Sequence, residues 1–502
     1  MLKNPGKILT IILLLGLVLR LAGINHSFPF IFHPDEPTII RSALGVRFDP
    51  NPGHFDWPHL YIYLNYFIYM FFAFIRDFLV SVGLKEAVSS AVPLLWNDDL
   101  IFYLITRILT AVLGGLTVIP IYLTGKKLFN ERVGLLSALC FSVFPYHVWH
   151  SHYSLSDVPM TFLLSWAIYF ASRILTEEDF GNYSRSGFYF GLSASTKYNG
   201  GLGVFIIPLA HVIRNISHKV LRVPKENYYS LSHSLLYIVG AALFSILGFI
   251  IGTPYSVLDY KTFIRTDGPK GALWQFTNVG SINILEYREE FIRRIVENVN
   301  ANLGYVVIPA VIFCIFLVLF RFIFKRYSKD DFHLLYLLIP ALLFLIYITG
   351  YDKNRAHYYF IMYPYYSLVF GYFVSWLFNI IYNKVKLLSF IYLLLIFFPL
   401  FLEGVKSSYK FYNNDSRVVL LNWSKNYIKP GSSISYTGDG LSEVVKTIDR
   451  YAISVDDLRI YQPDTHFYIS LEEKSPAVGY YNILNIDNTY HIGPDIFVYQ
   501  KK

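Results

Sequence analysis

Residues 235–251 read LLYIVGAALFSILGFII, a stretch without a single charged side chain. A helix that crosses the hydrocarbon core of a bilayer needs about 20 mostly apolar residues. Similar apolar runs occupy residues 8–19 and 305–319. Of the 502 residues, 54% are hydrophobic and 16% are charged, whereas soluble domains usually carry about 25% charged residues. The sequence therefore predicts a polytopic α-helical membrane protein and excludes a soluble, nuclear or fibrous one.

The formal net charge of +8 does not require a nucleic-acid partner, because Lys and Arg concentrate in the cytoplasmic loops of membrane proteins. Cys140 and Cys314 both lie in apolar stretches, so the sequence predicts neither a disulfide framework nor a cysteine-based metal site. No small-residue cleavage motif follows the run 8–19, which is what a removable signal peptide would need. We expect an uncleaved first span with the N-terminus in the cytoplasm.

Short basic breaks between the apolar runs set the expected topology, because such breaks face the cytoplasm. Their basic residues are Lys126, Lys127, Arg132, Arg214, Lys219, Arg222, Lys225, Arg321, Lys325, Arg326, Lys329, Lys384 and Lys386. With these breaks inside, about eleven spans are expected at 8–24, 101–124, 133–149, 156–175, 187–197, 200–213, 235–252, 303–324, 333–349, 358–381 and 387–403. The aromatic-rich stretch 60–80 would reverse this topology, so we expect a juxtamembrane helix or a re-entrant hairpin on the outer side.

This topology divides the chain into a transmembrane domain, residues 1–403, and an extracytoplasmic tail, residues 404–502. Two large outer loops, at about 25–100 and 253–302, belong to the first domain. The tail changes in composition: residues 415–428 have helical spacing, and 433–436, 466–471 and 496–499 alternate like strands. We expect a small α/β domain outside a plasma membrane.

The first candidate for chemistry is His33-Pro34-Asp35-Glu36-Pro37, directly after the first span. Ionisable groups at membrane depth are costly and usually mark substrate pathways or catalytic sites. Asp35 has the character of a general base in a half-dry cleft. The alternative is that Asp35 or Glu36 caps the following helix. Local spacing does not decide between the two interpretations.

The second candidate is residues 150–157, His-Ser-His-Tyr-Ser-Leu-Ser-Asp, in a short outer turn. His150 and His152 are possible metal ligands, but two residues apart they do not share a helix face, so this signal is weak. Asp157 lies on the same side of the membrane as Asp35 in the expected topology. A helix cap at Asp157 is the structural interpretation, and the local sequence favours it.

The third candidate is a set of cations near the outer ends of the spans: Arg20, Arg107, Lys197 and Arg355. Guanidinium and ammonium groups that converge at the outer leaflet suit a phosphate. Each alone is also explained by snorkelling to the lipid headgroups, the favoured interpretation for Arg20 and Arg355. Lys197 is harder to explain in this way, since its segment has no other formal charge.

An ordered set of short motifs accompanies these candidates. In chain order they are Asp35-Glu36, Asp56-Trp57-Pro58-His59-Leu60, Arg107-Ile108-Leu109-Thr110-Ala111, Tyr122–Phe129, Phe144-Pro145-Tyr146-His147, Ser151-His152-Tyr153, Asp157-Val158-Pro159, Gly191–Tyr198, Gly252-Thr253-Pro254-Tyr255, Leu258-Asp259 and Asp415-Ser416-Arg417 with Trp423. Together they resemble the protein O-mannosyltransferase-like branch, glycosyltransferase family 39, of the GT-C membrane glycosyltransferases. His59 departs from the second Pro of the family's turn, and the middle loop is too short for the extra sugar-recognition domains of eukaryotic members. The Trp-Trp-Asp signature of oligosaccharyltransferases is missing.

The resemblance implies a GT-C fold and transfer of a single sugar, with inversion, from a polyprenyl- or dolichyl-phosphate donor to an acceptor hydroxyl outside the membrane. It implies Asp35 as general base, with Glu36 and Asp157 beside it. It implies donor-phosphate contacts from Arg107, Lys197 and Arg355, and acceptor or loop roles for His152, Tyr255, Asp259 and Arg265. Lipid phosphate is already a fair leaving group, so we expect no strict metal requirement, although a divalent metal is possible because related enzymes differ.

Two other functions remain open from the sequence: a transporter or flippase for a polyprenyl-phosphate sugar, and a non-catalytic lipid-binding or assembly subunit. Transporters often contain paired broken helices in inverted repeats, whereas only the segment 187–213 shows such a break. The partners expected in every case are membrane lipids and a polyprenyl-phosphate headgroup. The sequence identifies neither the sugar nor the acceptor, which is a protein, a glycan or a lipid.

Overall fold

The computed structural model describes residues 4–177, 179–222, 231–278, 283, 285–352, 354–455, 464–473 and 479–502. Lys225, one of the expected cytoplasmic cations, lies outside the described residues. The chain divides into two compact units. Unit 1 contains Met1–Leu21 and Thr38–Val405, and unit 2 contains Ala22–Pro37 and Lys406–Lys502. The expected boundary near residue 403 falls close to this division, but the short segment after the first span joins the C-terminal part.

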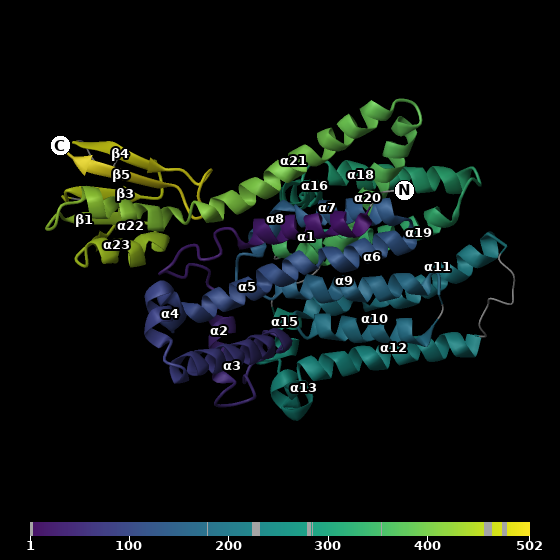
Figure 1. The fold of residues 1–502 in the computed structure, drawn as a ribbon, viewed down its shortest axis with the longest axis horizontal. Helices are drawn as coiled ribbons and strands as arrows, with labels where there is room; N and C mark the ends of the chain where they lie inside the picture. Colours follow the sequence, from purple (N-terminus) through teal and green to yellow (C-terminus); the bar gives the residue numbers. More distant parts are fainter. Residues whose placement is uncertain are drawn as a thin grey trace. The chain divides into compact units, whose positions relative to one another are not determined.

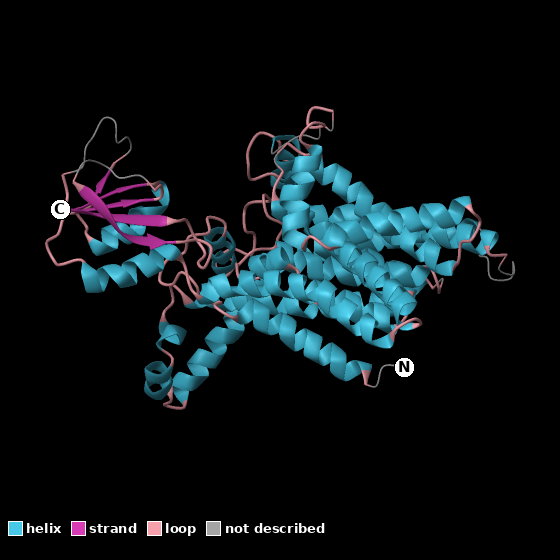
Figure 2. Ribbon diagram, turned by 90° about the horizontal axis from the view of Figure 1, so that it is seen from above, coloured by secondary structure: helices cyan, strands magenta, loops and turns pink. Residues whose placement is uncertain are grey.

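The described part of unit 1 is helical (Figures 1 and 2). Its helices begin with α1 (Pro5–Leu21), α2 (Glu36–Gly45, which starts at the end of unit 2), α3 (Leu60–Ser81), α4 (Lys85–Ala91), η1 (Pro93–Trp96), α5 (Ile101–Leu116), α6 (Val118–Leu128), α7 (Glu131–Ser142), α8 (Pro145–His150), α9 (Asp157–Ile174), α10 (Phe180–Ala194), η2 (Tyr198–Phe205) and α11 (Ile206–Val220). They continue with α12 (Leu231–Gly252), α13 (Tyr255–Leu258), α14 (Tyr260–Phe263), α15 (Ala272–Asn278), α16 (Phe291–Ile295), η4 (Val296–Asn300), α17 (Ala301–Leu303), α18 (Val307–Ile323), α19 (Lys329–Thr349), η5 (Ala356–Met362), α20 (Tyr363–Tyr382) and α21 (Lys386–Tyr412).

Seven stretches of helix in the described residues are long and apolar enough to cross a membrane. They are Leu60–Ser81, Ile101–Leu128, Tyr198–Val220, Ser234–Gly252, Lys329–Thr349, Ala356–Tyr382 and Lys386–Tyr412. The shorter helix α18 is also apolar. These helices confirm a multi-pass membrane protein, while the expected number of about eleven crossings stays a prediction.

Four of the segments that the sequence singles out differ in detail from the helices. The span 133–149 is broken, because α7 ends at Ser142 and α8 begins at Pro145; proline has no backbone N–H and is suited to the first turn of a new helix. The pair 187–197 and 200–213 becomes α10 and α11, joined by η2. The stretch 60–80 is the single continuous helix α3, so a hairpin is wrong there.

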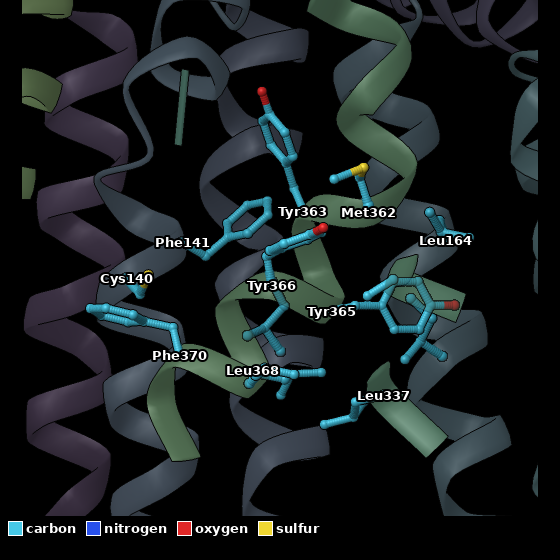
Figure 3. Close-up of a cluster of buried hydrophobic side chains, with 14 of the residues drawn as sticks. Cys140, Phe141, Leu164, Leu337, Met362, Tyr363, Tyr365, Tyr366, Leu368 and Phe370 are labelled. Atoms are coloured by element: carbon cyan, nitrogen blue, oxygen red, sulfur yellow. The ribbon is translucent and has the colours of Figure 1, made fainter. Parts of the chain in front are cut away.

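The core of unit 1 is aromatic to an unusual degree. Helix α20 alone buries Tyr363, Tyr365, Tyr366 and Phe370 completely, and Figure 3 shows Tyr363 and Tyr366 beside Phe141 of α7, with Tyr365 directed away from it. Large rings bury about 150–250 Å² each, so a few of them fill the space between the helices that surround α20. This packing explains why Tyr and Phe together exceed one residue in seven in the sequence.

Helices α10 and α12 lie side by side in Figure 1 and make a close backbone contact. A Cβ added to Gly187 would lie 2.1 Å from the carbonyl oxygen of Ala241, and one added to Gly191 would lie 2.0 Å from that of Ser245. Small residues let transmembrane helices approach in this way. The contact places the end of α10, and therefore Lys197, at a fixed position next to α12.

We expect Gly191→Ala to destabilise the protein, since the new methyl group would overlap a backbone carbonyl that has no flexible side chain to move. Overpacking of this kind costs roughly 1–3 kcal/mol. The measurement is the thermal unfolding midpoint of the purified protein in detergent. Gly45→Ala is the matched control, because no heavy atom lies within 4 Å of its added Cβ. Equal midpoints for the two variants would contradict the close contact.

Unit 2 contains a five-stranded mixed sheet (Figure 2) in the order β2-β1-β3-β5-β4. The strands are β1 (Ile434–Thr437), β2 (Ile453–Ser454), β3 (Phe467–Ser470), β4 (Tyr480–Ile486) and β5 (Ile496–Lys501). β1 pairs in parallel with β2 and β3, whereas β5 pairs antiparallel with β3 and β4. The helices are α22 (Ser416–Tyr427), η6 (Asp439–Leu441) and α23 (Ser442–Ile448). This sheet domain agrees with the expected α/β tail, with β2 and β4 as additions.

The segment 22–37 joins unit 2 through its aromatic side chains. Phe30 and Phe32 pack against the hydrophobic core of the sheet domain. The guanidinium carbon of Arg417 lies 3.4 Å from the centre of the Phe32 ring, and the carboxylate of Asp415 accepts hydrogen bonds of 2.8 Å from the same guanidinium. The cation–π contact therefore holds the segment that leads to Asp35, and the ion pair with Asp415 orients the guanidinium that makes this contact.

Candidate functional site

A buried ion pair joins two elements of unit 1. Asp157 is the first residue of α9, and Lys197 stands in extended backbone between α10 and η2. Lys197 Nζ lies 2.5 Å from Asp157 Oδ1. The side chains are 17% and 3% exposed, respectively. Lys197 is the only Asp, Glu, Lys or Arg in residues 187–213. The loop after α10 directs its side chain inward, where it contacts the carboxylate of Asp157.

Histidines complete the polar cluster. His150 Nε2, from the end of α8, lies 3.3 Å from the second oxygen, Oδ2, of Asp157. The ring of His357 in η5 stacks on that of His150, with centroids 5.6 Å apart. One carboxylate oxygen is therefore committed to Lys197 and the other to an imidazole, so Asp157 is held in one orientation.

Two aromatic rings flank the ammonium group of Lys197. Its Nζ lies 5.9 Å from the ring centre of Trp57 and 5.8 Å from that of Tyr358. These distances are within the range of a cation–π interaction. The cation is thus stabilised by a carboxylate and two ring faces, yet it keeps some exposure, which a ligand needs to reach it.

The first outer loop is pinned beside Lys197 by backbone contacts. Tyr198 Oη donates to the carbonyl of Phe55 over 2.7 Å. The backbone N–H of Leu60 donates to the carbonyl of Ser195 over 2.9 Å. These bonds bracket residues 55–60, which include Trp57, so the position of the indole ring follows from the fold of α10 and η2.

The middle outer loop contacts the same segment. The N–H of Phe55 donates to the carbonyl of Lys270 over 2.6 Å. Asn51 Nδ2 donates to Asp259 Oδ2 over 3.0 Å. Of the predicted loop residues, Asp259 therefore lies against the first outer loop. Tyr255 begins α13 and is half-buried.

Arg265 stands apart from the cluster around Lys197. It is exposed and forms an ion pair with Asp267 two residues later. This ion pair holds the pKa of Asp267 below its usual value. The contact is local to the middle loop, and the acceptor role of Arg265 stays a prediction.

The remaining predicted residues of unit 1 occupy different environments. Arg107 is completely buried in the middle of α5, and His152 is buried with its Nδ1 bonded to the carbonyl of Val148 over 2.9 Å. Arg355 is exposed and directly precedes η5, which carries His357 and Tyr358. The guanidinium of Arg20 is fully buried, so the snorkelling interpretation is wrong for that residue.

Asp35 and Glu36 belong to unit 2. The backbone N–H of Asp35 donates to Nδ1 of His33 over 3.2 Å, and Glu36 is buried as the first residue of α2. The carboxylate of Asp35 is half-buried and has no hydrogen-bond partner within the described part of its own unit. A general base needs a carboxylate oxygen that can accept a proton, and this role of Asp35 stays a prediction.

Sequence reasoning did not assign roles to Trp57, His150, His357 and Tyr358, which surround the ion pair. From the sequence, His150 is only a possible metal ligand. Among the described residues, no group of three or more His, Cys, Asp or Glu side chains is arranged to hold a metal ion. The sequence feature that could have identified these four residues is the presence of aromatic and imidazole side chains next to the predicted charges, as in Arg355-Ala356-His357-Tyr358.

Comparisons with known proteins bear on the same region. Residues 103–246 match the family described as dolichyl-phosphate-mannose-protein mannosyltransferase. This segment contains both members of the ion pair, Asp157 and Lys197. No match was found among curated proteins.

Solved structures are similar over most of the chain. The oligosaccharyltransferase of Archaeoglobus fulgidus, tethered to an acceptor peptide with the NVT sequon, matches with a TM-score of 0.51 at 14% identity, covering 90% of this chain and 64% of the other. ArnT of Cupriavidus metallidurans, bound to undecaprenyl phosphate, matches with a TM-score of 0.49 at 11% identity, covering 98% and 97%. The likeness to the archaeal protein shows the fold, and this chain spans about two thirds of that protein's length.

Proposed function

We propose that this chain is a multi-pass membrane glycosyltransferase of the GT-C superfamily, which transfers a single sugar from a polyprenyl-phosphate donor to an acceptor hydroxyl outside the membrane. The observation that carries the proposal is the Lys197–Asp157 ion pair between two aromatic rings. Ionisable groups buried among apolar spans usually mark a ligand site or a substrate pathway, and Lys197 lies in the segment that matches the family described as dolichyl-phosphate-mannose-protein mannosyltransferase.

In the proposed reaction the donor phosphate takes the ammonium group of Lys197 as its partner. Asp157 then retains the contact of its Oδ2 with His150 and remains an anion in the site. As the bond between sugar C1 and the phosphate oxygen breaks, negative charge builds on the phosphate, and Lys197 with Arg107 and Arg355 stabilises it. Positioned charges of this kind act strongly in a water-poor site.

The acceptor hydroxyl attacks C1 from the face opposite the phosphate, so the anomeric centre inverts. A new bond forms between C1 and the acceptor oxygen, the electron pair of the broken bond leaves with the phosphate, and Asp35 takes the hydroxyl proton. Glu36 supports this carboxylate from the next position in the chain, and His152 has a role in orienting the acceptor. In the proposed topology the N-terminus is cytoplasmic and the site faces outward across a plasma membrane.

A direct test incubates the purified protein with a panel of radiolabelled polyprenyl-phosphate sugars and measures released polyprenyl phosphate. We expect release with at least one donor, including slow hydrolysis without acceptor. A flippase would move the same lipid between the leaflets of proteoliposomes and leave the sugar attached. Intact donor throughout the panel, together with lipid movement, would contradict the transferase and support the transporter.

We expect transfer to persist after removal of divalent metal ions. The reason is that Lys197, Arg107 and Arg355 supply positive charge at the leaving phosphate, and a metal ion would stabilise the same developing charge. The measurement compares initial rates with and without excess EDTA, and less than a two-fold change is the expected result. Loss of activity that added Mn²⁺ or Zn²⁺ restores would contradict this expectation.

A further inference from the structure

Arg20, in the last turn of α1, is a buried cation without a carboxylate partner among the described residues. Its Nη1 donates to the carbonyls of Gly16 and Ser142 over 2.9 and 2.8 Å. Its Nη2 donates to Nδ1 of His147 over 3.0 Å and lies 3.4 Å from the carbonyl of Phe141. Burying a charge that is not paired is expensive, so a position that keeps one is a candidate for function.

The guanidinium joins three consecutive elements. Phe141 and Ser142 are the last residues of α7, and the final carbonyls of a helix have no partner within it. Arg20 therefore caps α7. Through His147 it also holds α8, which starts after a break of two residues. A planar fork with several donors suits this task, whereas a lysine offers one point charge.

The contact also fixes the state of His147. A guanidinium only donates, so Nδ1 of His147 accepts and its proton resides on Nε2. This makes the imidazole neutral. The ring is held between Phe141 and Phe360, at centroid distances of 4.6 and 5.2 Å, which leaves it one orientation.

The same short helix carries His150, one turn after His147. Phe360 contacts both imidazole rings at 5.2 Å, and His150 bonds to the carboxylate of Asp157. A six-residue helix is too short to be stable on its own, so outside contacts decide its orientation. Arg20 contacts α8 through His147, and the orientation of α8 determines how His150, at its end, contacts Asp157.

We propose that Arg20 is a positioning residue for the donor site: through His147 and α8 it sets His150 against Asp157 and thereby the carboxylate that pairs with Lys197. The inference rests on the proposed function in that it takes Asp157 and Lys197 as parts of the transferase site. A chain of contacts from α1 to Lys197 is the observation behind it.

The kinetic test uses Arg20→Gln and a matched pair at the next link. His147→Asn keeps an acceptor where Nδ1 stands, and His147→Leu removes it. A shift of about 1 Å at a reacting group costs about 100-fold in rate, so we expect Arg20→Gln and His147→Leu to lower kcat about 10- to 100-fold with KM for the donor changed less than about three-fold. His147→Asn should stay within about three-fold of wild type, and so should the control Arg173→Gln, whose ion pair with Glu177 is exposed. A wild-type kcat in the folded fraction of both Arg20→Gln and His147→Leu would overturn the proposal.

A second readout does not need activity. If Arg20 positions Asp157, the effects of Arg20→Gln and Asp157→Asn on the thermal midpoint will be coupled, whereas independent sites add. We expect the double variant to lose clearly less than the sum of the single losses. Additive losses would overturn the inference even if transfer is established, and coupling in a protein that releases sugar from no donor would count against the proposed function alone.

Discussion

Replacing Asp35 with Asn is expected to lower sugar transfer about 1,000-fold while donor binding stays unchanged. General base catalysis contributes typically ~10²–10⁴-fold, and an amide of the same size cannot accept the hydroxyl proton. Donor binding is assigned to Lys197 and the arginines in unit 1, so the affinity for the lipid should not depend on this carboxylate. The measurement is a single-turnover assay with saturating donor, beside a binding assay with the unreactive lipid phosphate.

Asp99→Asn is the control for this experiment, since Asp99 is exposed at the end of the first outer loop and has no assigned role. Wild-type rates are expected for it. A second substitution, Glu36→Gln, separates the role of the base from that of a supporting residue. Because Glu36 is buried, Glu36→Gln should lower the transfer rate less than Asp35→Asn does, and should lower the stability of the protein more. If Asp35→Asn keeps more than a tenth of the wild-type rate, another group removes the proton.

The membrane character and most helix positions were predictable from the sequence, because burial in lipid demands long apolar helices that satisfy their own backbone. The breaks were harder. Residues 133–149 look like one span, yet Pro145 starts a new helix within it. In unit 2, β4 escaped prediction since a bulge between Asn482 and Leu484 interrupts its alternation, so the period of two was absent from the pattern.

The candidate site was predictable to the level of its charges. Lys197 and Asp157 both stood out as ionisable groups next to apolar spans, and the structure brings their side chains together. Their surroundings were not predictable: Trp57 and Tyr358 lie 301 residues apart in the sequence, and only tertiary packing brings both rings near one ammonium group. Arg20 illustrates the same limit, since a sequence does not reveal which carbonyls a neighbouring helix end leaves free.

Replacing Lys197 with Met should damage both stability and transfer, and the two effects can be separated. Without the ammonium group, the 3% exposed carboxylate of Asp157 would be a buried charge whose remaining contact is His150. Removing one partner of a buried ion pair costs roughly 3–5 kcal/mol. Thermal unfolding in detergent is expected to show a lower midpoint for Lys197→Met, and donor binding should fall with it.

The double variant Lys197→Met with Asp157→Asn distinguishes the two effects. It carries neither buried charge, and replacing both members of such a pair is often neutral, so most of the lost stability should return. Transfer and donor binding should not return, because the cation that receives the phosphate is still missing. Lys127→Met serves as the control, since Lys127 pairs with Glu177 near the surface and such pairs contribute about 0–1 kcal/mol. A double variant that binds the lipid phosphate as tightly as wild type would show that Lys197 is structural and that the donor phosphate binds elsewhere.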